Sequence, residues 1–241
     1  MSAGYPNNPE WRALREGTGP VPACGGRECA LSVVECGELV MRSGRLVACD
    51  PFVFLEREGN EAIDVGPGRY RVAVTLADVS DARDGSHVRE AYASLILADR
   101  PEAERRGVAP HEAGEAPEEL GPGELAAFAV DAGTACFVDD DAVARFMPEE
   151  DTWHDELFES EDPGCWFARM DDPDHIREGL ANIVLPGADD GSNIVIVHSG
   201  WGDGVYPVVG GYDADGNLVA VHIDFAVVGA SGDEGDEDDE E

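Results

Sequence analysis

Lysine is absent from this chain, and all 16 of its basic residues are arginine. Such a composition is typical of proteins from GC-rich genomes, so we attach no function to the missing side chain. Basic residues are scarce overall, because 52 Asp and Glu give the 241 residues a formal net charge of −36. A chain this acidic repels phosphate backbones and anionic membrane surfaces. We therefore expect no binding to nucleic acid or membranes, and a basic protein, a cationic ligand or a divalent ion becomes the expected partner.

Long apolar runs are missing as well. The N-terminal residues lack the basic start and apolar core of a secretory signal, and no stretch approaches the length of a membrane span. This favours a cytoplasmic location, in which cysteines are expected to stay as free, buried thiols. The early cysteines also lack the paired C-x2-C spacing of a structural zinc site. The six are Cys24, Cys29, Cys36, Cys49, Cys136 and Cys165.

Composition divides the chain into three parts. Residues 1–28 carry Pro, Gly and Asn with few apolar side chains and indicate an irregular N-terminal arm. Residues 29–229 have the apolar content of a single domain, and residues 230–241 form a disordered acidic tail because they bury too little apolar surface to fold. Without the eight acidic residues of the tail, 44 acidic and 16 basic residues remain, a net charge of −28. The domain itself is therefore acidic.

Apolar alternation predicts mostly strands between these ends. "ELVMRSGRLVACD" indicates a hairpin that turns at Ser43–Gly44. "VGPGRYRVAVTL" predicts a half-buried strand with Tyr70, Val72, Val74 and Leu76 on one face. "REAYASLILADRP" favours another strand, and residues 101–123 are expected to be an exposed loop.

The second half of the domain combines strands with a helical segment. Residues 124–139 predict a strand pair bent at Ala132–Gly133, followed by a helix near 140–147 whose start Asp139 suits as a cap. Weaker helical character continues to residue 182, and three strands follow. The fold class is therefore α+β: mainly antiparallel β-sheet, as one sheet or two packed sheets, with a short helical insertion near 140–182.

Four blocks of sequence carry a resemblance to a known family. They are "GRLVACDPF", "VGPGRYRVAVTL", "FAVDAGTACFVDDDAV" and "NIVIVHSGWGDGVYPVVGGYDADGNLVAVHIDF". In this order, over about residues 36–226, they resemble the bacterial family called domain of unknown function 4241. The resemblance implies a mostly β domain and supplies no reaction, substrate or catalytic residue.

The "SGWGDGVY" block is the candidate rim of a ligand or partner site. Ser199 lacks the preceding glycine and the strand-to-helix context of a nucleophile elbow, which argues against a serine hydrolase. Trp201 is flanked by two glycines, and its indole either covers the hydrophobic core as a lid or forms the wall of a pocket. We favour the role as a core lid. Trp201, Asp203 and Tyr206 are the rim candidates.

His198, His222 and Asp224 are the candidate metal ligands. His222 and Asp224 are two residues apart in a predicted strand, so both lie on one face. His198 ends another predicted strand, which could be its neighbour. With Asp203, the set suits a divalent ion or acid–base catalysis, so His198, Asp203, His222 and Asp224 are also the catalytic candidates. We predict no other cofactor.

Other aspartates have structural interpretations. The "DADGN" segment at 213–217 has the alternating acids of a calcium loop, but it lacks the distal ligands and is better explained as a hairpin turn. Asp50, Asp131 and Asp139 stand at strand ends and helix starts, where carboxylates usually accept hydrogen bonds from backbone amides.

Two functions of different classes remain open, and the sequence does not decide whether the protein is an enzyme. The first is an acidic interaction module that binds and regulates or neutralises a basic protein partner. The second is a small metal-dependent hydrolase that uses the His/Asp cluster. The oligomeric state is not indicated by any pattern.

Overall fold

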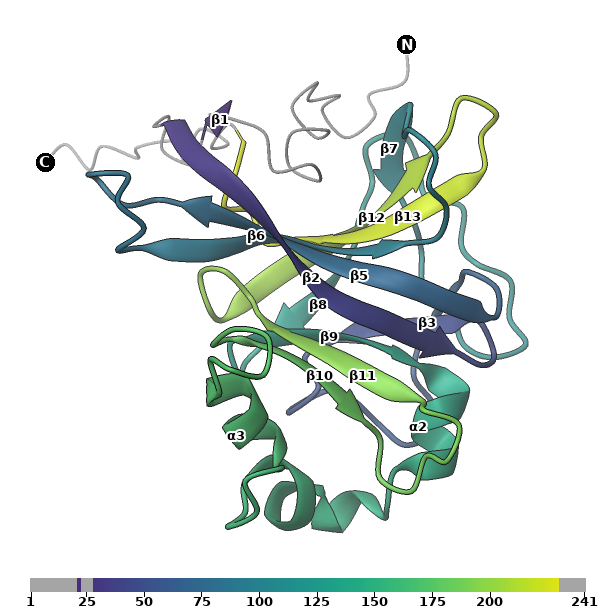
Figure 1. The fold of residues 1–241 in the computed structure, drawn as a ribbon. Coiled ribbons are helices and arrows are strands. Elements are labelled where there is room, and N and C mark those ends of the chain that lie inside the picture. Colours follow the sequence, from purple (N-terminus) through teal and green to yellow (C-terminus); the bar gives the residue numbers. More distant parts are fainter. Residues whose placement is uncertain (1–20, 23–27, 230–241) are drawn as a thin grey trace, which may run out of the picture.

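A computed structural model describes residues 21–22 and 28–229 of the chain. Its strands form two antiparallel sheets (Figure 1). The larger sheet has the order β1-β2-β5-β6-β13-β12, and the far side of β12 pairs with β8 along its first half and with β7 along its second. Its strands are β1 (Val21–Pro22), β2 (Glu28–Met41), β5 (Gly68–Asp78), β6 (Val88–Ile96), β7 (Glu104–Gly107), β8 (Ala126–Val130), β12 (Gly204–Tyr212) and β13 (Leu218–Asp224).

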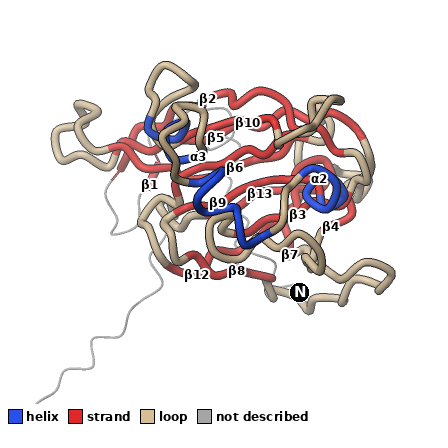
Figure 2. Tube along the Cα trace, turned by 90° about the horizontal axis from the view of Figure 1, so that it is seen from below, coloured by secondary structure: helices blue, strands red, loops and turns tan. Residues whose placement is uncertain are grey.

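The smaller sheet has the order β10-β11-β9-β3-β4 and carries the helices on its outer side (Figures 1 and 2). Its strands are β3 (Arg45–Cys49), β4 (Ile63–Asp64), β9 (Thr134–Asp139), β10 (Leu180–Val184) and β11 (Asn193–His198). The helical elements are α2 (Asp140–Phe146), the 3-10 turn η1 (Glu150–Thr152), the π-helical turn η2 (His154–Phe158) and α3 (Trp166–Asp171). The predicted α+β class, with two packed sheets and a helical insertion, is confirmed.

The strands of the smaller sheet are buried on both faces. Along β9, Ala135 and Phe137 enter the cluster between the sheets, whereas Cys136 and Val138 enter the cluster under the helices. This strand has continuous apolar character because both of its faces are covered. The protein is therefore a three-layer stack of large sheet, small sheet and helices, with one apolar core in each gap.

Hydrogen bonds between asparagine side chains and backbone tie the two sheets together beside β2. Asn193 accepts from the Val40 amide at 2.9 Å and donates to the Glu38 carbonyl at 2.8 Å. Asn182 donates to the Cys36 carbonyl at 2.7 Å, next to the bulge that interrupts β2. These contacts close this side of the two-sheet stack.

The hairpin predicted at Ser43–Gly44 is wrong. The two apolar runs become β2 and β3, which belong to different sheets, so the chain crosses between layers at this point. Asp139 holds the crossing, because its Oδ2 accepts from the Ser43 amide at 2.9 Å and from the Gly44 amide at 3.1 Å. Gly44 does have the expected positive φ of 78°, and a Cβ there would lie 2.2 Å from the Gly66 carbonyl carbon.

The strand pair predicted around Ala132–Gly133 is also a crossing. β8 pairs with β12 in the larger sheet, and β9 pairs with β11 and β3 in the smaller one. Local alternation cannot distinguish a hairpin from a chain that changes sheets, because both need two strands and a turn.

Two further segments differ from expectation. Residues 101–123 include β7, which pairs with β12, and the segment buries Glu102 and Arg105. The weak helical character expected up to residue 182 is wrong, because α3 ends at Asp171 and β10 begins at Leu180. Val72, Val74 and Leu76 share the inner face of β5 as predicted, and Tyr70 packs against the same cluster. The other face of this strand is exposed at Arg69 and Arg71 and buried at Ala73 and Thr75.

Several predictions concern residues outside the described part of the chain. Most of the irregular arm at 1–28, including Cys24, and the disordered tail at 230–241 lie there. The other five cysteines are free and buried, as expected. Within the described ranges, none of the helices has the length and apolar character needed to cross a membrane.

Candidate functional site

The structure does not bring the predicted metal ligands together. His198 ends β11 in the smaller sheet and is exposed, whereas His222 and Asp224 lie on β13 in the larger sheet. Asp203 lies in the loop between β11 and β12, where its Oδ1 accepts from the Gly133 amide at 3.1 Å. Across residues 28–229, no group of three or more His, Cys, Asp or Glu side chains is arranged to hold a metal ion.

His222 instead takes part in a buried hydrogen-bond network. Its Nδ1 is 2.7 Å from Ser94 Oγ, and its Nε2 is 3.2 Å from Glu102 Oε2. Arg105 Nε donates to the same carboxylate at 3.1 Å. Although burial by itself would raise the pKa of Glu102, His222 and Arg105 hold it below its ordinary value.

This network resembles a Ser-His-Glu arrangement in its connectivity, but its members belong to the core. Ser94, His222 and Glu102 are at most 2% exposed, and they join β6, β13 and the segment before β7. Sequence reasoning missed Ser94, Glu102 and Arg105. Ser94 is a single polar residue in an apolar run, and the other two lie in a segment whose composition is typical of an exposed loop, so no sequence signal identified them.

Asp224 is a buried acid at the end of β13, two residues after His222. Its Oδ2 accepts from the Tyr92 hydroxyl at 2.8 Å, and its Oδ1 accepts from the Ala226 amide at 2.8 Å. Burial raises the pKa of Asp224 to about 7. The Asp224 carboxyl therefore exchanges a proton near neutral pH, and this makes the stability of the fold depend on pH.

The "SGWGDGVY" block forms a tight loop between the two sheets. Ser199 Oγ and the Tyr206 hydroxyl both donate to the Gly202 carbonyl, at 2.7 and 2.8 Å. Gly200 has a φ of +66°, and a Cβ there would lie 2.7 Å from the Glu90 carbonyl oxygen. Gly200 is therefore required by both backbone geometry and close packing, whereas Gly202, with a φ of +95°, is favoured by backbone geometry alone.

The three rim candidates have different surroundings. Trp201 is 49% exposed, so the favoured role as a core lid is wrong, and the Arg89 guanidinium lies 5.7 Å from its ring centre. Asp203 is exposed beside it. Tyr206 is buried and packs edge-on against Phe225 in the core.

The structural interpretation is confirmed for Asp50 and Asp139, whereas the Asp131 side chain is exposed and only its backbone amide takes part, as a donor to Asp50. Asp50, which is fully buried, accepts from the Asp131 and Ala132 amides at 3.0 and 2.7 Å and from Thr134 Oγ1 at 2.8 Å. Asp139 caps α2 by accepting from the Ala142 amide at 3.1 Å. Both carboxylates fix the points at which the chain crosses between sheets.

The "DADGN" segment is a hairpin turn between β12 and β13. The Asp213 amide donates to the Asn217 carbonyl at 2.9 Å, and Asp213 Oδ1 accepts from the Asn217 amide at 2.8 Å. Arg100 also pairs with the Asp213 carboxylate. The oxygens of Asp213 are therefore used by the turn itself.

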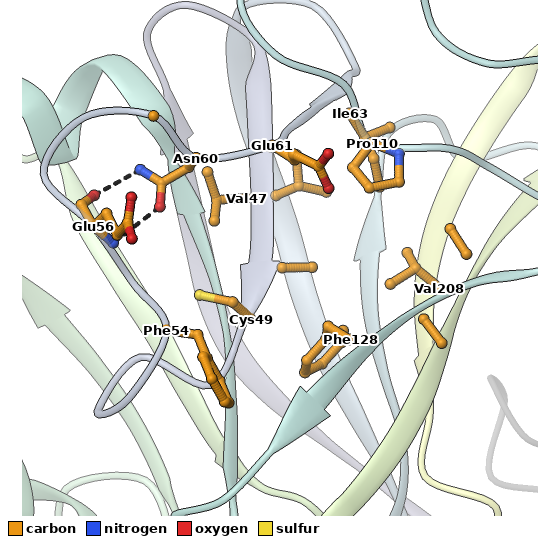
Figure 3. A pocket seen from close by; sticks show the side chains of 15 residues that line it. Val47, Cys49, Phe54, Glu56, Asn60, Glu61, Ile63, Pro110, Phe128 and Val208 are labelled. Atoms are coloured by element: carbon orange, nitrogen blue, oxygen red, sulfur yellow. Dashed lines mark hydrogen bonds between the residues drawn. The ribbon is translucent and has the colours of Figure 1, made fainter.

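A cavity of about 280 Å³ lies where β3 of the smaller sheet faces β8 and β12 of the larger one (Figure 3). Sequence reasoning did not find it, because its walls come from segments far apart in the chain. Its apolar walls are formed mainly by Val47, Phe54, Ile63, Pro110, Phe128 and Val208. Its charged lining residues are Glu56 and Glu61, both exposed to solvent.

Local hydrogen bonds shape the wall that carries these carboxylates. The loop from β3 to β4 is folded back on itself, since the Glu56 amide donates to Asn60 Oδ1 at 3.0 Å and Asn60 Nδ2 donates to the Glu56 carbonyl at 2.6 Å (Figure 3). Asn60 also donates to Asp140 Oδ1 at 3.2 Å, which joins the loop to the start of α2. The cavity therefore has a fixed wall beside Glu56.

The cavity lies beside two strand edges that are only partly paired. β4 pairs with β3 only at Arg45 and Leu46, so the part of β3 from Val47 to Cys49 has no neighbour on that side among the described strands. β8 pairs with β12 alone within the same ranges. Unpaired edges of this kind are sites at which another strand can add.

Comparison with known proteins gives a family and no closer relative. The family model described as "Protein of unknown function (DUF4241)" matches residues 39–223, which confirms the resemblance carried by the four sequence blocks. No curated protein and no solved structure matches the chain. The matched region includes the smaller sheet, the helices and all residues that line the cavity, but β1 and most of β2 in the larger sheet lie before it.

Proposed function

We propose that this chain, which belongs to the DUF4241 family of proteins of unknown function, is an acidic interaction module that binds a basic protein partner and thereby regulates or neutralises it. The observation that carries the proposal is an acidic domain with an apolar cavity bordered by Glu56 and Glu61. Apolar anchoring sites within charged surroundings are characteristic of protein interfaces.

Charge supports a basic partner. The net charge is −36 for the chain and −28 without the residues of its acidic end. Such a field accelerates the approach of a positively charged protein and opposes the approach of an acidic one. It therefore selects the class of partner before any contact forms.

Exposed aromatic side chains beside the cavity support a protein as the ligand. Phe54 is 46% exposed and lines the cavity. Phe52, two residues earlier, stacks on Phe167 of α3 with ring centres 4.4 Å apart, and Phe167 is itself 36% exposed. Aromatic residues are enriched at protein interfaces because they bury a large area with few rotatable bonds.

The metal-dependent hydrolase is not the function that the geometry favours. That hypothesis needs His198 to act with His222, and the two lie in different sheets. His222 is fully buried and bonded to Ser94 and Glu102.

Affinity capture from the cells that produce the protein, followed by reconstitution with the purified partner, tests the proposal. We expect a basic protein to be retained at about 50 mM salt and its Kd to rise at least about tenfold by about 500 mM, because salt screens exposed charges.

The double variant Glu56→Gln/Glu61→Gln should weaken binding. The matched control Glu35→Gln/Glu38→Gln removes the same charge from exposed positions on β2, near the opposite edge of the larger sheet. Retention of no protein, or only of proteins without net positive charge, contradicts the proposal.

A further inference from the structure

We propose that the partner contributes an extended segment that adds antiparallel to the open edge of β8 and inserts an arginine side chain into the neighbouring cavity. The inference rests on the proposed function and specifies how the basic partner is bound. It is carried by the backbone of β8, the shape of the cavity and the position of two carboxylates.

The hydrogen-bond alternation of the larger sheet leaves donors and acceptors free along β8. The bond from the Leu97 amide to the Val219 carbonyl, 2.9 Å, sets which residues of β13 face β6. The odd-numbered residues of β13 thus bond to β6, and its even-numbered residues bond to the odd-numbered residues of β12. The even-numbered residues of β12 are left to bond to β8, and their partners there are the even-numbered residues of β8. The backbone groups of Ala127 and Ala129 therefore point to the open edge. Both residues are exposed, and within the described part of the chain they have no hydrogen-bond partner there.

The side chains of β8 show where those of an added strand would lie. Phe128 and Val130 pack toward the space between the sheets, and Phe128 lines the cavity. Paired residues of adjacent strands direct their side chains to the same face of a sheet. A strand bound to Ala127 and Ala129 would thus direct alternate side chains outward and the others toward the cavity.

An arginine side chain matches the cavity in shape and charge. The volume of about 280 Å³ is at the small end for ligand pockets and accommodates a single long side chain better than a large ligand. The aliphatic part of arginine can pack between Phe54 and Phe128 (Figure 3). Its guanidinium can then reach the wall that carries Glu56 and Glu61, where charge-assisted hydrogen bonds to carboxylate are strong.

Smaller features of β3 agree with this mode of binding. In the smaller sheet, the Val65 amide donates to the Gly44 carbonyl at 2.8 Å, so the even-numbered residues of β3 direct their backbone groups away from β9. Those of Ala48, which lines the cavity, are among them. The open edge of β3 therefore borders the same cavity as β8, on the side of the two-sheet stack opposite the Asn182 and Asn193 contacts.

A synthetic peptide tests the geometry directly. The probe is Thr-Val-Thr-Arg-Thr-Val-Thr with blocked ends, whose single positive charge limits non-specific attraction to the acidic protein. Titration is followed by NMR, together with hydrogen exchange at the Ala127 and Ala129 amides. We expect saturable binding and slowed exchange at both amides. Replacing the peptide arginine with methionine, or using the Glu56→Gln/Glu61→Gln protein, should weaken binding at least about fivefold, whereas Glu35→Gln/Glu38→Gln should not.

Backbone methylation supplies the decisive comparison. In antiparallel addition with the arginine side chain inward, the amides of the threonines face β8 and those of the valines face solvent. Methylating the two central threonine nitrogens should weaken binding at least about tenfold, and methylating the two valine nitrogens should not. Equal effects, loss confined to the valine set, or no binding at about 5 mM peptide would overturn strand addition. If the captured basic partner still binds in those cases, the proposed function stands without this mode of binding.

Discussion

Replacing Asp224 with asparagine should stabilise the protein at neutral pH and remove a pH dependence of the native chain. Asp224 is 4% exposed, and burial raises the pKa of its carboxyl from 3.8 to about 7. Asparagine has nearly the same shape as the protonated acid. It keeps an acceptor for the Ala226 amide and can donate to the Tyr92 hydroxyl, whose own proton rotates to suit.

The direction of the pH dependence follows from whether the folded or the unfolded protein holds the Asp224 proton more tightly. The folded-state pKa lies above the unfolded-state value, so the contribution to stability is fully present below about pH 3.8 and is lost as the pH rises to about 7. At about 1.36 kcal/mol per pH unit, the difference between the two values corresponds to about 4 kcal/mol. The free energy of unfolding of Asp224→Asn, relative to the native protein, should therefore rise by up to that amount across this range and then level off.

Urea unfolding of both proteins between about pH 4 and pH 8 measures this difference, and subtraction cancels the titration of the other carboxylates. Asp203→Asn is the control, since it makes the same substitution at an exposed side chain in the loop between β11 and β12. A constant difference for Asp224→Asn, or a native protein that is the more stable of the two at pH 8, would refute the reasoning.

Three more predictions concern the crossings and the thiols. Asp50→Ala should lower the free energy of unfolding by at least about 3 kcal/mol, because it leaves the Ala132 and Asp131 amides without their acceptor. The control Asp131→Ala, at an exposed side chain, should change the free energy of unfolding by less than about 1 kcal/mol. In thermal unfolding, Gly44→Ala should destabilise the protein by several kcal/mol more than Gly85→Ala. Both glycines have positive φ, but a Cβ at Gly85 meets nothing within 4 Å. Equal effects of the two substitutions would contradict the close packing at Gly44. Burial raises the pKa of the Cys36 thiol to about 12, so its alkylation at about pH 8, followed by mass spectrometry, should be at least about a hundredfold slower in the native protein than in urea. Comparable rates would show that the strand carrying Cys36 opens readily.

Local patterns predicted the features that depend on local physics. Asp139 caps α2 because a carboxylate before a helix satisfies amides within the next turn, and the 213–217 turn closes between two strands that are neighbours in sequence and in space. The strand positions of β5, β6, β11, β12 and β13 followed from alternation and turn residues. In these cases the partners of each residue lie a few positions away in the chain.

The candidate site could not be predicted in the same way. Phe54, Phe128 and Val208 come from three separate segments, and they line one cavity only because β3 and β8 meet across the two sheets. Glu102 and Arg105 lie in a segment with the composition of a loop, and their burial beside His222 depends on β7 pairing with β12. No spacing in the sequence encodes such contacts.

Composition and local patterns were enough to predict the acidic charge, the α+β class and the residues that turn or cap the chain, because these properties depend on residue content and short-range hydrogen bonds. Four blocks of sequence were enough to recognise the family. The tertiary structure alone decided that the chain crosses between sheets at Gly44 and Gly133, where a local pattern also fits a hairpin. Those crossings place His198 and His222 in different sheets and bring Glu56 and Glu61 to the same cavity as β8. The physical reason is that the pairing of distant strands is set by burial of both faces of the smaller sheet, which is a property of the whole chain.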